Sequence, residues 1–137
     1  MSASEAFFDS NVLVYLTDEE SGKSGQTEDI LAGGGVISLQ VLNEFASVAR
    51  RKVRLSWAET REFLDTFRAT LKIVPLTLET HERGLELAER YGLSVYDGMI
   101  VAAAQLAGCT VLYSEDMHDG LVIDRLTIRN PYAAGGG

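Results

Sequence analysis

The sequence has one cysteine, two prolines and two histidines among its 137 residues. It also lacks any apolar run of the roughly 18 residues that a membrane-spanning helix needs. The lone Cys109 cannot form an internal disulfide and has no thiolate neighbours in sequence for a structural zinc site. The N-terminus lacks the basic start and apolar stretch of a signal peptide. These absences predict a soluble, cytoplasmic protein without a membrane partner.

Positive charge is also scarce, because 12 Lys and Arg residues face 20 Asp and Glu residues, for a net charge of −8. Such a chain repels a polyanion, so binding a nucleic acid would require a local basic patch or a bound divalent cation. The densest basic cluster is Arg50, Arg51, Lys52 and Arg54. This cluster is a candidate contact for a nucleic-acid backbone, and a helix C-terminus stabilised by cations is the alternative. The overall acidity would also suit a basic protein partner.

The length and the 46% hydrophobic content predict one domain over residues 1–132, followed by a disordered tail at 133–137. Short strand-like runs alternate with longer helical ones, which indicates an α/β domain. Its strands should be mostly parallel and covered on both faces. The strands are expected at 6–8, 36–38, 72–75, 110–113 and 126–128.

Helix boundaries follow from capping signals. The pattern Ser56-Trp57-Ala58-Glu59 is a capping box that begins a helix reaching about Leu71. The helix over 78–91 should end at Gly92, and Ser94 to Asp97 is a second capping box, whose helix ends near Gly108. The glycine-containing stretch 17–26 is a poor helix former, and we predict a loop or a frayed turn there.

Two acids lie where predicted strands end. Asp9 directly follows the strand at 6–8, and Asp116 comes three residues after the strand that ends at Tyr113. Ligands of open parallel sheets bind at the carboxyl ends of the strands, so both acids are candidates for a site. For Asp9 the alternative is a helix N-cap.

Two further acids lie on helix faces that should point inward. Glu44 shares a face with Phe45 and Val48, where an unpaired carboxylate would be costly to bury. A buried ion pair with an arginine is the alternative to a site ligand. Asp97 shares a face with Ile100 in the first turn of its helix, and the alternative there is the capping box itself.

No histidine, cysteine or lysine accompanies the four acids in a nucleophile–base pattern. Oxygen-only ligand sets select hard divalent cations such as Mg²⁺ or Mn²⁺. Carboxylates crowded together also raise one another's pKa unless a cation compensates their charge. We therefore expect a metal-dependent site that acts on phosphate groups.

The segments around these acids resemble a PIN-domain ribonuclease, and in particular the VapC-type toxin of a toxin–antitoxin pair. The resemblance is strongest in FFDSNVLVY, VISLQVLNEF, YGLSVYDGMIVAAAQLAGCTVLYSEDM and LTIRNPY. The acidic quartet of that family maps onto Asp9, Glu44, Asp97 and Asp116. Asn11 and Ser114 match residues that accompany the first and fourth acids. Gly98 departs from the pattern, because an alanine is expected after Asp97.

The resemblance implies a three-layer α/β/α fold with a central sheet of about five parallel strands. It also implies Mg²⁺ or Mn²⁺ held by the four acids, endonucleolytic hydrolysis of RNA, a homodimer and a cognate antitoxin that blocks the site. Asn11, Ser114 and Asp119 would support the acids indirectly. For Asp119 the alternative is a solvated turn residue.

Three other classes compete with this interpretation. A phosphoacceptor receiver domain needs paired acids after its first strand and another acid after its third, which Ile73 to Leu76 does not provide. A dehalogenase-like phosphatase begins D-x-D, whereas this chain has Asn11 two residues after Asp9. A non-catalytic module that binds a metal or a protein stays open.

Overall fold

One mixed sheet forms the centre of the computed structural model, which describes residues 5–133. Its order is β3-β2-β1-β4-β6-β5. The strands are β1 Ala6–Phe8, β2 Val36–Ser38, β3 Lys72–Val74, β4 Val111–Tyr113, β5 Val122–Ile123 and β6 Leu126–Arg129. Of the predicted tail at 133–137, residues 134–137 lie outside the described part.

Five of the strands pair in parallel, as predicted, and β5 adds an antiparallel edge next to β6. Strand β5 was not predicted, because its two residues are too few to stand out as an apolar run. A tight turn joins β5 to β6, with Asp124 in the left-handed region at φ 56°. The antiparallel edge therefore comes from a local hairpin rather than from another crossover.

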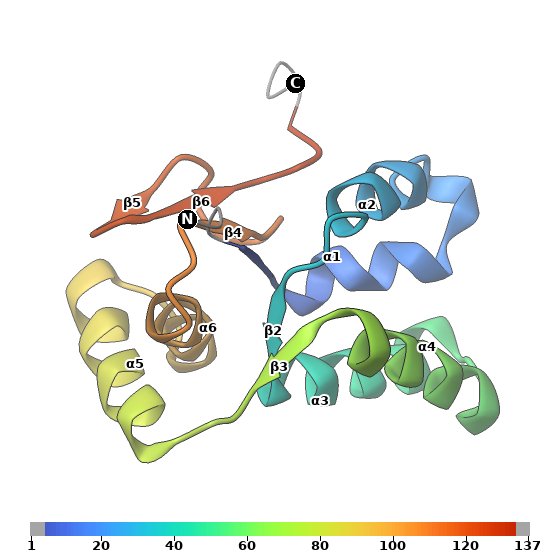
Figure 1. Ribbon diagram of the computed structural model, residues 1–137, viewed down its shortest axis with the longest axis horizontal. Coiled ribbons are helices and arrows are strands. Elements are labelled where there is room, and N and C mark those ends of the chain that lie inside the picture. Colours follow the sequence, from blue (N-terminus) through green and yellow to red (C-terminus); the bar gives the residue numbers. More distant parts are fainter. Residues whose placement is uncertain (1–4, 134–137) are drawn as a thin grey trace.

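Helices connect the strands from β1 to β4 and cover both faces of the sheet. They are α1 Ser10–Val14, α2 Ser24–Leu31, α3 Leu39–Val48, α4 Trp57–Thr70, α5 Leu78–Tyr91 and α6 Val95–Leu106, with short helical segments η1 Tyr15–Thr17, η2 Glu19–Ser21 and η3 Ala49–Val53. The chain first moves outward from β1 to β3 and then returns to β4. Right-handed crossovers consequently place α1 to α4 on one face and α5 and α6 on the other (Figure 1).

The predicted helix boundaries are confirmed at α4 and α5. The Ser56 hydroxyl accepts from the Glu59 amide at 3.0 Å, and the Glu59 carboxylate accepts from the Ser56 amide at 2.9 Å. Helix α5 ends at Gly92, which has a left-handed φ of 67°. At α6 the Ser94 hydroxyl accepts from the Asp97 amide at 3.1 Å. This is one of the two hydrogen bonds of the predicted capping box.

The prediction of a loop or frayed turn at 17–26 was wrong in part, because this stretch contains η2 and the first turn of α2. Contacts distant in sequence stabilise it. The Lys23 ammonium lies 2.6 Å from the Glu115 carboxylate, and the Thr27 and Tyr132 hydroxyls share a hydrogen bond. Local propensity alone therefore underestimated its helical content.

Helices α5 and α6 approach each other closely through Gly84 and Gly98. A methyl group on Gly98 would collide with the carbonyl oxygen of Gly84, and one on Gly84 would collide with the side chain of Met99. Gly98, which departs from the family pattern, is thus explained by helix packing. The interhelical contact fixes the first turn of α6, which carries Asp97.

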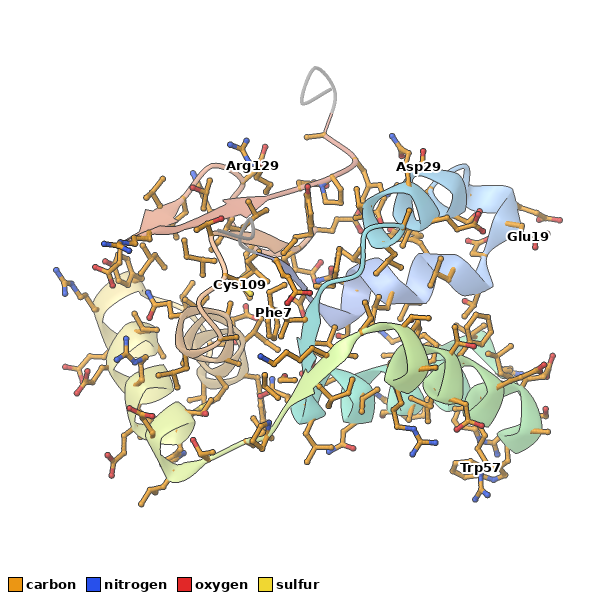
Figure 2. The ribbon with its side chains drawn as sticks, viewed as in Figure 1. Phe7, Glu19, Asp29, Trp57, Cys109 and Arg129 are labelled. Carbon is orange, nitrogen blue, oxygen red and sulfur yellow. The ribbon has the colours of Figure 1, made fainter. Side chains whose placement is uncertain are left out.

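Phe7 and its buried neighbours form the core at the centre of the molecule (Figure 2). The apolar residues of α6 from Met99 to Ala104 are buried in this core. Between residues 5 and 133, no helix has the length and hydropathy to cross a bilayer.

Candidate functional site

The strand order reverses between β1 and β4, and the candidate site lies at the carboxyl ends of these two strands. The register pairs Phe8 with Tyr113, and the Asp9 amide donates to the Tyr113 carbonyl at 3.0 Å. Asp9 and Ser114, the residues that directly follow the two strands, therefore lie side by side. Open α/β sheets bind ligands at such a reversal.

Asp9 is buried, with 5% of its surface exposed, and its carboxylate is enclosed by donors. Oδ2 accepts from the Ser114 hydroxyl at 2.9 Å and from the Asn11 side-chain amide at 3.4 Å. Oδ1 accepts from the Ser10 amide at 2.8 Å, so Asp9 also caps α1. The Asn11 oxygen accepts from the Glu115 amide at 3.1 Å, which ties this cluster to the loop after β4.

The pKa of Asp9 is raised to about 7, chiefly because burial disfavours the charged form. The hydrogen bonds from Ser114 and Ser10 lower this pKa, and the charges of Glu44 and Asp97 raise it. The charge of Asp9 thus interacts with those of two other acids of the quartet, Glu44 on α3 and Asp97 on α6.

Glu44 is half-buried on α3, and neutral donors hold its two oxygens. The Ser10 hydroxyl donates to Oε1 at 3.1 Å, and the Gln40 side-chain amide donates to Oε2 at 3.2 Å. The ion pairs found in residues 5–133 are Lys23–Glu115 and Arg68–Asp65. No described arginine or lysine therefore pairs with Glu44, and the alternative of a buried ion pair was wrong.

Asp97 is half-buried in the first turn of α6, and Asp116 is exposed in the loop after β4. The pKa of Asp97 is raised, mainly by burial and further by the charge of Asp116, against a lowering hydrogen bond with Ser94. Asp9 interacts with Glu44 and Asp97, and Asp97 interacts with Asp116. All four acids therefore belong to one electrostatically connected group.

The acids are nevertheless not arranged as a finished metal centre. Within the described part of the chain, no three His, Cys, Asp or Glu side chains are grouped closely enough to hold a metal ion. The donor type does fit a hard divalent cation, since the oxygens are carboxylates and no described Lys or Arg forms an ion pair with any of the four acids. Binding by three of the acids would require the side chains to move closer together.

Three supporting residues, Ser10, Gln40 and Glu115, were missed by the sequence analysis. Gln40 lies one helical turn before Glu44, a spacing that signals contact on the same face. Ser10 and Glu115 carry no such signal, because their contacts with Glu44 and Asn11 join residues 34 and 104 positions apart.

The predicted basic cluster lies in and just after η3. Arg50 is committed to local packing, because its guanidinium donates to the Leu55 carbonyl at 2.6 Å and lies 4.3 Å from the Trp57 ring centroid. Arg51, Lys52 and Arg54 are exposed. Figure 2 places Trp57 at the outer edge of the molecule, away from the central Phe7.

Asp119 is exposed, and its carboxylate accepts from the Asn130 amide at 2.8 Å. This contact stabilises the turn that precedes β5 and β6. This position favours the alternative interpretation of Asp119, a solvated turn residue.

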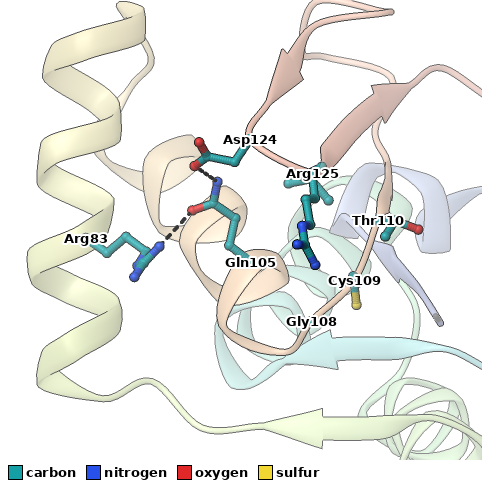
Figure 3. Close-up of a pocket in the computed structure, with 8 residues that line it drawn as sticks. Arg83, Gln105, Gly108, Cys109, Thr110, Asp124 and Arg125 are labelled. Atoms are coloured by element: carbon teal, nitrogen blue, oxygen red, sulfur yellow. Dashed lines mark hydrogen bonds between the residues drawn. The ribbon is translucent and has the colours of Figure 1, made fainter.

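A separate cavity of about 370 Å³ opens at the amino end of β4 (Figure 3). Arg83, Gln105, Cys109, Asp124 and Arg125 contribute to its lining, and Gln105 links Arg83 to Asp124. None of the four acids lines it. The candidate site therefore does not coincide with this cavity.

Several solved structures share this fold. The chain is similar to a toxin–antitoxin complex from Klebsiella pneumoniae, with a TM-score of 0.71 and 25% identity over 93% of this chain and 98% of that one. It is also similar to the Mycobacterium tuberculosis toxin VapC20, described as cleaving the sarcin–ricin loop, with a TM-score of 0.67 and 17% identity over 81% and 89% of the two chains. A third similar structure is Rickettsia felis VapBC2 bound to a DNA fragment from its promoter. It has a TM-score of 0.66 and 22% identity over 91% of this chain and 97% of that one.

No curated protein matches the sequence. The family model of the PIN domain matches residues 6–118, which is most of the chain. The resemblance to PIN domains inferred from the sequence is thus confirmed, and the chain shares its fold with VapC20 and VapBC2. The chain belongs to the PIN domain family.

Proposed function

We propose that this protein is a metal-dependent endoribonuclease that hydrolyses RNA phosphodiester bonds and acts as the toxin of a toxin–antitoxin pair. The observation that carries the proposal is Asp9, a buried carboxylate at the reversal of the strand order with two acidic neighbours and no cationic partner among the described residues. Membership of the PIN family and the likeness to VapC20, named as a toxin that cleaves the sarcin–ricin loop, support it.

In this proposal Asp9, Glu44, Asp97 and Asp116 hold Mg²⁺ or Mn²⁺. When bound, the ion supplies positive charge that lowers the pKa of water and stabilises the leaving oxygen of the phosphodiester. Oxygen ligands and uncompensated negative charge match the preference of both ions.

Other residues of this chain orient Asp9 and Glu44, and they influence the protonation of Asp9. Ser114 and Asn11 fix the direction of the Asp9 carboxylate, and the Ser114 hydrogen bond favours its ionised form. Ser10 and Gln40 each donate to one oxygen of Glu44 and so fix the direction of its carboxylate. Asp97 and Asp116 are more accessible and can adjust toward a ligand. Asp119 takes no direct part, in keeping with its contact to Asn130.

RNA must approach a protein of net charge −8. We assign the phosphate contacts to Arg51, Lys52 and Arg54, which are exposed beside the site-bearing helix α3. Arg50, the fourth member of the cluster, supports them through its packing on Trp57. A local patch of this kind can bind a backbone despite the overall charge.

The proposed partners are a cognate antitoxin, a second copy of the chain in a homodimer, and RNA in the cytoplasm. The antitoxin is supported by the likeness to a chain of the Klebsiella toxin–antitoxin complex. Most of the apolar face of α6 is buried against its own chain, so a dimer contact through α6 would use its exposed ends, such as Val95 and Leu106.

One observation favours the alternative of a non-catalytic module that binds a metal or a protein. No three of the potential ligands between residues 5 and 133 are grouped closely enough for a metal ion as they stand. A module of this kind would keep the fold and the antitoxin contact without turnover.

Incubation of purified protein with structured RNA separates the two candidates. We expect cleavage with Mg²⁺ or Mn²⁺, no cleavage with chelator, and loss of cleavage in Asp9→Asn and Asp97→Asn. Asp29→Asn is the matched control, because it removes one charge from an exposed position on α2.

Cleavage that persists in both site variants would contradict the assignment of the acids. Metal binding without any cleavage by the wild type would favour the non-catalytic module.

A further inference from the structure

Gln40 is a buried polar side chain that lies between two acid-bearing helices. It belongs to the first turn of α3, and only 7% of its surface is exposed. Its side-chain nitrogen donates to Oε2 of Glu44 at 3.2 Å and to the backbone carbonyl of Tyr96 at 3.1 Å. One amide group thus joins a carboxylate of the proposed site to the residue before Asp97.

Both contacts of Gln40 depend on its side-chain amide nitrogen. An amide nitrogen carries two hydrogens, so it can satisfy both acceptors at once. Ser10 holds Oε1, so the two oxygens of Glu44 have one donor each. Among the described residues, Gln40 is the side chain that donates hydrogen bonds to both Glu44 and the first turn of α6.

We propose that Gln40 is a positioning residue, which fixes the Glu44 carboxylate and ties it to the first turn of α6. The inference rests on the proposed function of the acids as metal ligands. Glu44 then reaches the ion in a preset direction, and the Glu44-bearing and Asp97-bearing helices cannot separate freely. Hydrogen-bond partners of metal ligands typically contribute about 10- to 100-fold to metal affinity.

The test compares Gln40→Met with Gln26→Met. Methionine matches the length of glutamine without its donor, and Gln26 is exposed on α2. We expect Mn²⁺ to bind about 10-fold more weakly to Gln40→Met and unchanged to Gln26→Met, by titration calorimetry. In RNA cleavage at limiting Mn²⁺, kcat should fall while KM for RNA stays within about twofold, because Gln40 is not assigned an RNA contact.

A double-mutant cycle with Glu44→Gln shows whether Gln40 acts through Glu44. Without the carboxylate, Gln40→Met should change the Mn²⁺ dissociation constant by less than about threefold. An equal, roughly 10-fold effect in both backgrounds would overturn the inference and indicate general loss of structure.

A metal-free measurement tests the contact with α6. Loss of the bond to the Tyr96 carbonyl should speed amide hydrogen exchange in the first turn of α6 by about fivefold, since a typical hydrogen bond contributes about 1 kcal/mol. Unchanged exchange would overturn the proposed tie between the helices.

The failure of this inference can be told from failure of the proposed function. If the wild type binds Mn²⁺ and cleaves RNA but Gln40→Met behaves like Gln26→Met, the positioning role is wrong and the nuclease stands. If the wild type neither binds Mn²⁺ nor cleaves RNA, the proposed function is wrong, and with it the role of Gln40 toward a metal.

Discussion

The hydroxyl of Ser114 donates a 2.9 Å hydrogen bond to Oδ2 of Asp9, across a sequence separation of 105 residues. The contact exists because β1 and β4 are neighbours in register, with Phe8 opposite Tyr113. A slip of one residue would turn one of the two side chains to the other face of the sheet. The geometry of the proposed site therefore depends on strand register.

Replacing Ser114 should shift the pH dependence of cleavage. The Ser114 hydrogen bond lowers the pKa of Asp9, so Ser114→Ala should raise this pKa further above its value of about 7. The ionised form would then appear at higher pH, and the acidic limb of the pH–rate profile should move up by about 1 unit. Thr66→Ala, which removes an exposed hydroxyl from α4, is the control. A profile that stays in place would show that Asp9 does not govern this limb.

The buried Asp9 should make the metal-free protein less stable as the pH rises. The folded pKa of about 7 exceeds the ordinary value of 3.8, so between these values the folded state keeps a proton that the unfolded state releases. The free energy of unfolding therefore falls as the pH increases from about 4 to 7, by up to about 4 kcal/mol. Urea denaturation in chelator at pH 5 and pH 8 measures the part of this loss that falls between the two pH values, about 3 kcal/mol.

The Asp9→Asn variant should lack that part of the pH dependence. Its free energy of unfolding, relative to that of the wild type, should therefore be higher at pH 8 than at pH 5. Added Mn²⁺ should stabilise the wild type at pH 8 more than the variant. An equal stability difference between the two proteins at both pH values would argue against the raised pKa.

Gly98 should not tolerate a side chain. The methyl group of Gly98→Ala would collide with the Gly84 carbonyl, forcing α5 and α6 apart at a cost of about 1–3 kcal/mol. Gly25→Ala on α2 is the matched control, because open space surrounds its added methyl group. Thermal denaturation should give a lower Tm for the first variant only. If both variants melted alike, the close approach of α5 and α6 would not limit stability.

The exposed part of the basic cluster should act through charge. The double variant Arg51→Gln, Lys52→Gln should bind RNA more weakly. If each side chain contacts one phosphate of a single strand, the slope of the logarithm of the RNA association constant against the logarithm of salt concentration should become smaller by about 1.4. Arg83→Gln with Arg90→Gln removes the same charge from α5 and should leave the slope unchanged. Fluorescence anisotropy over a salt series measures both. Equal losses in the two double variants would indicate a nonspecific effect of net charge.

Much of the fold could be predicted from the sequence because the signals are local. The capping box of Ser56 and Glu59 and the stop at Gly92 act within one or two turns of helix. Short apolar runs likewise located the five parallel strands, and the acids after two of them indicated a site. The roles of these acids stay predictions.

Only the tertiary structure decided which groups meet. Glu44 could have paired with an arginine, and instead it lies against Ser10 and Gln40. The stretch at 17–26 was predicted as a loop or frayed turn, and Lys23 reaches Glu115 from there. Spacing along the chain encodes the face on which a side chain lies, because helices and strands have fixed periods. It does not encode the partner across a sheet or between helices, since strand order and packing bring that partner from a distant part of the chain.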